Sequence, residues 1–140
     1  MFLDASAIVA ILGREPGHEE LEKRLFAGEE KVFVSPLVTF EASMALARQK
    51  AMNRKPSSDL LHQARRVVEA FIEDLGAEEV SISPEIGKAA FEAGAVFGKA
   101  VGHVADLNFG DCFAYACARQ ARVPMLYKGD DFARTDVEAA

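Results

Sequence analysis

The chain opens with Met1-Phe2-Leu3-Asp4, an apolar run that predicts a very short strand ending at a carboxylate. Ser6 comes two residues later and is a typical N-cap residue, so a helix is expected over residues 7–12. A strand that leads directly into a helix is typical of α/β proteins, provided that strands and helices continue to alternate.

The rest of the sequence shows this alternation. Further strands are predicted at residues 31–34, 79–82 and 123–127. Apolar residues at helical spacing predict helices at residues 19–26, 36–51, 56–75, 84–98 and 111–122. A length of 140 residues fits one ordinary domain. The pattern therefore predicts a single domain over residues 1–140, with a three-layer α/β/α fold and a short, mostly parallel central sheet.

Composition narrows the class of protein. The 16 Lys and Arg residues against 22 Asp and Glu residues give a net charge of −6, so the basic surface typical of DNA-binding domains is absent. Asp4 interrupts the N-terminus before any signal-like apolar run, and no stretch approaches the ~18 apolar residues of a membrane helix. A cytoplasmic protein without membrane contact is expected. Cys112 and Cys117 are predicted to be unpaired core residues.

Several acidic residues follow the predicted strands. Asp4 ends the first strand, and Asp130 and Asp131 come just after the last one. Ligands of parallel α/β proteins bind where the strands deliver their carboxyl ends, so acids from both ends of the chain are expected at one edge of the sheet. The alternative for Asp4 is an ordinary turn or helix-cap residue.

Two acids lie on predicted helices. Glu41 falls at the margin of an apolar stripe, where a carboxylate needs a partner, either an arginine or a bound cation. Asp111 precedes the apolar face of the helix at 111–122, so it is expected to cap that helix, to bind a metal, or to do both. Asp106 is a second candidate in the same loop.

The residue types indicate which metal would suit such a cluster. Carboxylates without an accompanying His or Cys cluster favour a hard divalent cation, Mg²⁺ or Mn²⁺, over zinc. His18, His62 and His103 have no ligand spacing and are expected at the surface. Ser6 has no histidine placed as a base, so a hydrolase triad has no support.

Four sequence blocks together resemble a known family. Residues 1–7, Phe40-Glu41, residues 107–116 and residues 126–136 resemble the acidic motifs of PIN domains, specifically the VapC toxins of toxin–antitoxin systems. The resemblance runs along the whole chain in order, whereas residues 54–101 carry little motif signal.

The resemblance implies an endoribonuclease that depends on Mg²⁺ or Mn²⁺, is usually a homodimer, and is inhibited by a VapB-like antitoxin. Asp4, Glu41, Asp111 and Asp131 match the family's metal-binding and catalytic acids, with Asp4 and Asp111 as direct ligands and Glu41 acting through water. Asp131 fits the glycine–any–aspartate–phenylalanine pattern, although the adjacent Asp130 remains an alternative. Ser6 matches a hydroxyl position that orients a ligand or water. The corresponding hypothesis is in-line attack on an RNA phosphodiester by a metal-activated water.

An acidic protein that binds RNA needs local cations for the phosphates. Lys128, Arg134 and Arg14 are the nearest by sequence, with solvated surface charges as the alternative interpretation. The apolar residues Leu21, Leu25 and Phe26, and those of residues 60–75, form either core or a partner surface.

Two other functions are open from the sequence. A Mg²⁺-dependent phosphotransfer domain has a second acid close to the first, but Asp4-Ala5-Ser6 lacks it, and only Lys128 suits a receiver domain. A non-catalytic PIN-like interaction module is expected to lose one or more acids, and all four positions are filled here.

Overall fold

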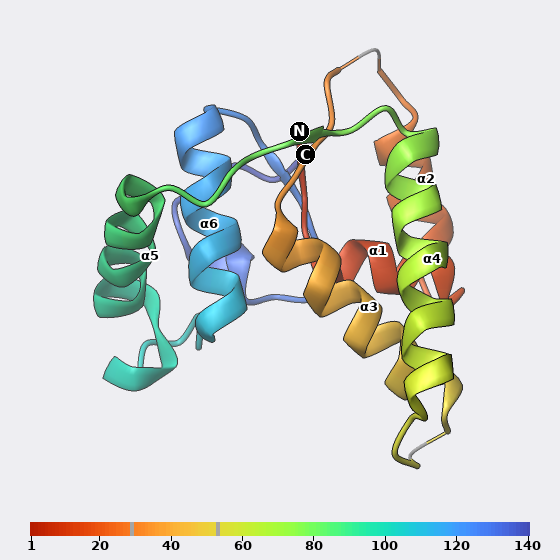
Figure 1. Ribbon diagram of the computed structural model, residues 1–140. Helices are drawn as coiled ribbons and strands as arrows, with labels where there is room; N and C mark the ends of the chain where they lie inside the picture. Colours follow the sequence, from red (N-terminus) through yellow and green to blue (C-terminus); the bar gives the residue numbers. More distant parts are fainter. Residues whose placement is uncertain (29, 53) are drawn as a thin grey trace.

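The computed structural model describes residues 1–28, 30–52 and 54–140 and has a small parallel sheet surrounded by helices (Figure 1). The strands are β1 (Phe2–Leu3), β2 (Phe33–Val34), β3 (Glu78–Glu79) and β4 (Met125–Leu126), in the spatial order β3-β2-β1-β4. Phe2 of β1 pairs with Phe33 on one side and Met125 on the other. The predicted α/β fold with a short parallel sheet is confirmed.

Six α-helices and two 3₁₀ helices are found in the described residues. They are α1 (Ala5–Leu12), α2 (His18–Leu25), α3 (Pro36–Lys50), α4 (Ser58–Asp74), α5 (Pro84–Phe97), η1 (Lys99–Val101), α6 (Phe109–Ala121) and η2 (Phe132–Arg134). Figure 1 shows α5 beside α6 and, on the other side of the molecule, α3 beside α4. The two ends of the chain lie close together, because Phe2 N–H donates to the Pro124 carbonyl and Ala140 N–H donates to the Met125 carbonyl.

Serine side chains cap the starts of three helices. The hydroxyl oxygens of Ser35, Ser57 and Ser83 each accept the backbone N–H three residues later, at 3.2–3.3 Å. Proline follows Ser35 and Ser83 directly, at the position of a helix where no N–H is needed. These caps fix the starts of α3, α4 and α5.

The helices α1, α4 and α6 each begin two residues away from the predicted start. Asp4, not Ser6, caps α1, and Ser6 N–H donates to the Asp4 carboxylate at 2.9 Å. Asn108 is the N-cap residue of α6, which begins two residues earlier than predicted, and Asp111 joins the cap from the third helical position. Asp, Asn and Ser all cap well, so closely spaced candidates are not separated by residue type.

The strands are shorter than their apolar runs. β2 occupies only the second half of the predicted 31–34 segment, and β3 lies at Glu78–Glu79 instead of residues 79–82. β1 offers only two residues for pairing, because α1 begins at Ala5 directly after Asp4. Its neighbours therefore pair over equally short lengths.

The core is continuous around β1. Leu21 and Leu25 of α2 are buried in it, so this apolar stripe is core and not a partner surface, whereas Phe26 is exposed. Cys112 and Cys117 are buried and unpaired, as predicted. None of the helices in the described part of the chain has the length and apolar character needed to cross a membrane.

The central position of β1 leads to a stability prediction. Leu3 is fully buried, so Leu3→Ala removes apolar contacts on several sides and is expected to lower the free energy of unfolding by about 3 kcal/mol. Val67, which is 43% exposed on α4, provides the control, and Val67→Ala is expected to change it by less than about 0.5 kcal/mol. Urea denaturation measures both; equal losses would contradict the assignment of β1 to the centre of the core.

Candidate functional site

Asp4 stands at the carboxyl end of the central strand and is only 4% exposed. Its Oδ2 accepts two hydrogen bonds from Ser6, one from the backbone N–H at 2.9 Å and one from the hydroxyl at 2.5 Å. The Ser6 hydroxyl oxygen also accepts the backbone N–H of Lys128 at 3.0 Å, just beyond β4. Ser6 therefore connects Asp4 to the far end of the sequence and holds its carboxylate in one orientation.

Glu41 lies in the second turn of α3 and is half-buried against the start of α6. A Cβ built on Gly110 would lie 2.3 Å from Glu41 Oε2. The carboxylate therefore lies against the backbone at Gly110, in space that another residue type would fill. A neighbouring pocket of about 390 Å³ has Glu41, Arg48 and Phe109 in its wall.

Asp111 is the third residue of α6 and forms a capping box with Asn108. Its Oδ2 accepts the Asn108 N–H at 2.8 Å, and Asn108 Oδ1 accepts the Asp111 N–H at 3.1 Å. These reciprocal bonds satisfy two backbone donors at the helix start. They engage Oδ2 and leave the second carboxylate oxygen out of the cap.

The acids influence one another electrostatically. Burial raises the pKa of Asp4, and the charge of Asp131 raises it further. Burial, followed by the charges of Asp4 and Asp111, raises the pKa of Glu41. Burial and the charges of Asp4 and Asp131 raise the pKa of Asp111 to about 6, against the lowering effect of its hydrogen bond from Asn108. The fold thus gathers acids from four separate parts of the sequence.

Two adjacent acids follow β4, Asp130 and Asp131. The charge of Asp131 raises the pKa of both Asp4 and Asp111. Asp131 is exposed and precedes η2, so it lies at the rim of the cluster while Asp4 lies at its base. Asp106 pairs instead with Lys99 at 3.7 Å and adds a smaller charge effect on Asp111.

The cluster is not neutralised by neighbouring cations. Within residues 1–28, 30–52 and 54–140, no ion pair within 4.0 Å involves Asp4, Glu41, Asp111 or Asp131. The charge of Arg48 lowers the pKa of Glu41, but less than burial and the neighbouring acids raise it. In this same part of the chain, no three His, Cys, Asp or Glu side chains are arranged closely enough to hold a metal ion. The negative charges of the acids are therefore not neutralised by ion pairs, and the carboxylates are farther apart than the ligands of a bound metal ion.

Four of the basic and histidine residues considered from sequence have other partners. Lys128 Nζ donates to Glu15 at 2.5 Å, and the second Glu15 oxygen accepts from Gln49 at 3.0 Å. This pairing also removes the free lysine that suited a receiver domain. Arg134 donates to the Val104 carbonyl at 3.3 Å. His18 and His103 are half-buried, contrary to the prediction of surface residues, because their Nδ1 atoms bond to backbone; His62 is exposed.

Sequence reasoning missed two residues that shape the site, Asn108 and Gly110. Asn108 and Asp111 have the spacing of a capping box, which was a readable signal. A glycine inside the first turn of a helix is unfavourable by itself, so Gly110 signals a close approach of another group. The identity of that group, Glu41, depends on how α3 packs against α6.

The raised pKa of Asp111 predicts a pH dependence of stability. The folded protein keeps this proton up to about pH 6, whereas the unfolded chain releases it near pH 3.8, so the free energy of unfolding falls as pH rises through this window. Asp111→Asn retains an oxygen for the cap and loses the charge. Without added metal, it is expected to stabilise the protein at pH 7 by about 1 kcal/mol and to have little effect at pH 4.

Denaturant titrations at pH 4, 5, 6 and 7 measure this difference. Asp130→Asn, a change of equal charge at an exposed neighbouring position, is the matched control and is expected to leave the pH profile unchanged. A variant at position 111 that is less stable than the wild type at pH 7 would contradict the electrostatic account.

Comparison with known proteins identifies the family to which this chain is similar. The family model of the PIN domain matches residues 1–138. The chain is 50% identical over 139 residues to a VapC ribonuclease of Rhizobium meliloti (strain 1021), an alignment that covers 97% of this chain and 98% of the relative. It is 31% identical over 140 residues to ribonuclease VapC42 of Mycobacterium tuberculosis (strain ATCC 25618 / H37Rv), covering 100% of this chain and 98% of the relative.

A solved structure shows the same fold. The crystal structure of Mycobacterium tuberculosis VapC20, described as a toxin that cleaves the sarcin-ricin loop, superposes with a TM-score of 0.73 and 18% sequence identity. The superposition covers 99% of this chain and 97% of that one. With four acids gathered at one sheet edge, a family match over nearly all residues and close relatives of full length, the chain belongs to the PIN domain family and, within it, to the VapC proteins.

Proposed function

We propose that this chain is the toxin of a toxin–antitoxin pair and acts as a metal-dependent endoribonuclease that hydrolyses RNA phosphodiester bonds. The observation that carries the proposal is the convergence of Asp4, Glu41, Asp111 and Asp131, none of which forms an ion pair within 4.0 Å in the described part of the chain. The names of the full-length VapC relatives support ribonuclease activity. A VapB-like antitoxin is the proposed protein partner, RNA the substrate, and a homodimer the proposed assembly.

The donor set fits Mg²⁺ or Mn²⁺ by its chemistry. Carboxylate oxygens are the ligands that hard divalent cations prefer, and a cation would relieve the repulsion that raises the pKa values of these acids. Asp4 and Asp111 would hold the ion directly, with Asp131 at the rim. When bound, the ion supplies positive charge that stabilises the developing charge on the phosphate and lowers the pKa of the attacking water.

The protein's own contribution is orientation. Ser6 holds the Asp4 carboxylate by two hydrogen bonds, and Asn108 holds Oδ2 of Asp111. Glu41, which is fixed against Gly110, is proposed to orient the attacking water through its carboxylate. Arg48, in the wall of the pocket beside Glu41, is proposed to contact an RNA phosphate. Lys128 is a weaker candidate for that role, because Glu15 already pairs with it.

Cleavage of total bacterial RNA by purified, antitoxin-free protein tests the activity. Discrete fragments are expected with Mg²⁺ or Mn²⁺ and none with EDTA. Asp111→Asn and Asp131→Asn are expected to lower the rate by roughly 100-fold or more, because each removes a negative charge that would help to hold the cation.

Asp130→Asn is the matched control for Asp131→Asn and is expected to cleave like the wild type. Cleavage that persists in EDTA or in Asp111→Asn would overturn both the activity and the site. A folded wild-type protein that binds Mn²⁺ but cleaves no RNA would favour a non-catalytic interaction module.

The contact between Gly110 and Glu41 gives a test that changes none of the acids. Gly110→Ala places a methyl group where Oε2 of Glu41 now lies, so the flexible end of the glutamate must move aside. The cleavage rate is expected to fall roughly 10- to 100-fold, the usual effect of misplacing a catalytic group by about 1 Å.

Unfolding measurements are expected to show no loss of stability in Gly110→Ala, since alanine favours the helix. Gly28→Ala is the control, because its added Cβ would be at least 3.8 Å from neighbouring atoms outside adjacent residues. Wild-type cleavage by Gly110→Ala would show that the position of Glu41 against α6 is not required.

A further inference from the structure

Helix α3 has a side that the core does not use. One side of the helix is buried in the core through Val38, Ala42 and Leu46. A second side, at helical spacing, lines the pocket beside the acid cluster and carries Leu37, Phe40, Glu41, Met44 and Arg48. Phe40 is 65% exposed. A single exposed apolar residue is ordinary in proteins, but three apolar residues beside an acid of the site require an explanation.

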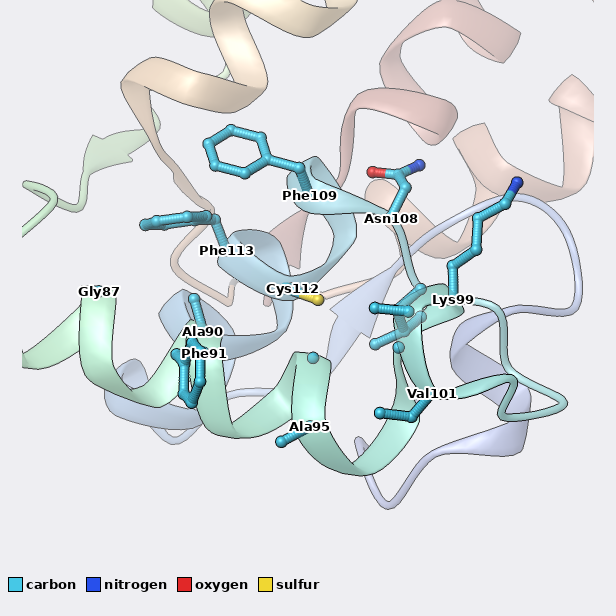
Figure 2. Close-up of a pocket in the computed structure, with 14 residues that line it drawn as sticks. Gly87, Ala90, Phe91, Ala95, Lys99, Val101, Asn108, Phe109, Cys112 and Phe113 are labelled. Atoms are coloured by element: carbon cyan, nitrogen blue, oxygen red, sulfur yellow. The ribbon is translucent and has the colours of Figure 1, made fainter.

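The pocket has a volume of about 390 Å³, and its remaining lining residues lie at the start of α6: Asn108, Phe109 and Gly110. Phe109 is 71% exposed, and the centre of its ring is 4.9 Å from that of Phe113 on the same helix. Figure 2 shows Asn108 and Phe109 where α6 begins, in the lining of the neighbouring groove between α5 and α6. The pocket beside Glu41 therefore has two exposed aromatic rings, one from α3 and one from α6.

The pocket is continuous with the acid cluster through Glu41, which belongs to both. The charges of Asp4 and Asp111 act on this carboxylate and raise its pKa. A group bound in the pocket would therefore lie next to the phosphate that the acids are proposed to cleave. Every phosphodiester of RNA has a nucleotide on each side, so a base beside the cleaved bond needs a place outside the cluster. The volume of the pocket is within the roughly 300–1,000 Å³ that is usual for small-ligand sites.

The side chains of the pocket match the chemistry of a nucleobase. Unpaired bases stack on aromatic rings, which Phe40 and Phe109 supply. Oδ1 of Asn108 accepts a hydrogen bond in the cap of α6, whereas its amide nitrogen forms no hydrogen bond within the described part of the chain and is available to a base edge. Arg48 lies two helical turns beyond Glu41 and forms no ion pair within 4.0 Å in those residues, so its charge remains for a phosphate.

We propose that one unpaired nucleobase of the RNA stacks on Phe40 and Phe109, next to the phosphodiester that is cleaved. This inference deepens the proposed ribonuclease function and rests on it. The amide nitrogen of Asn108 would donate to the edge of the base. Bases within a duplex are covered on both faces by their neighbours, so only an unpaired base could enter the pocket. The two phenylalanines would thus position the substrate and take no part in the chemistry.

Steady-state cleavage of a single-stranded 20-nucleotide RNA, which carries one site that the wild type cuts in total RNA, tests the proposal. Phe40→Ala is expected to lower kcat/KM roughly 5- to 100-fold, the usual effect of removing an aromatic side chain that stacks on a base. Phe40→Trp is expected to retain most of the activity, since an indole ring also stacks. Phe26→Ala is the matched control, because Phe26 is 64% exposed at the end of α2 and does not line the pocket. It is expected to cleave like the wild type.

Removing bases from the RNA identifies what occupies the pocket. In a set of RNAs that each lack one base near the cut, the wild type is expected to lose activity at one position by the same factor as Phe40→Ala loses on the intact RNA. Phe40→Ala is expected to lose nothing further on that abasic RNA, because the ring and the base act as a pair. Losses that multiply at every position would overturn the base pocket.

The other outcomes separate the pocket from the ribonuclease. Wild-type cleavage by Phe40→Ala would overturn the base pocket, leave the ribonuclease, and point to a protein segment such as part of the antitoxin as the occupant. No RNA cleavage by the folded wild type would overturn the proposed function and the pocket with it. An equal loss in Phe26→Ala would attribute the effect to exposed apolar surface in general. Circular dichroism melts establish that each variant is folded, which the exposure of both positions leads us to expect.

Discussion

The buried carboxylate of Asp4 is the constraint on which the site depends. A charged group that is 4% exposed needs hydrogen bonds, and Ser6 provides two of them. The Ser6 hydroxyl donates to Asp4 while its oxygen accepts the Lys128 N–H, just beyond the strand β4 that pairs with β1. One polar contact thus links the first strand, the first helix and the last strand. The position of the acid cluster follows from it.

The short strands serve this arrangement. Two-residue strands add little hydrogen bonding of their own, and the fold is held mainly by helices packed around β1. What the sheet contributes is alignment, since its parallel strands release Asp4 and the segment leading to Asp131 at one edge. Helices α3 and α6 then bring Glu41 and Asp111 to that edge from the side. The cluster is built from four chain segments, so no local motif could contain it.

Sequence alone predicted the helices and strands better than it predicted the contacts between them. The serine–proline signals at 35–36 and 83–84 fixed two helix starts, because the capping geometry is local. Asp4 and Asn108 displaced Ser6 and Asp111 as caps, since several good caps stood within three residues of each other. The sequence did not predict the pairing of Lys128 with Glu15 or the contact of Glu41 with Gly110. Both join residues far apart in sequence, and only packing decides them.

The unbalanced acids show how stability and the proposed activity oppose each other. Burial and mutual repulsion raise the pKa values of Asp4, Glu41 and Asp111, so each ionised acid makes the folded state less favourable than neutral residues would. Any cation that binds the folded chain and not the unfolded one raises the free energy of unfolding and so offsets part of this loss. The same cation would reverse the local charge that repels RNA from an acidic protein. The folded protein is therefore expected to be least stable when these acids are ionised and no cation is bound. That is the form ready to bind metal, and a loss of stability at a functional site is common.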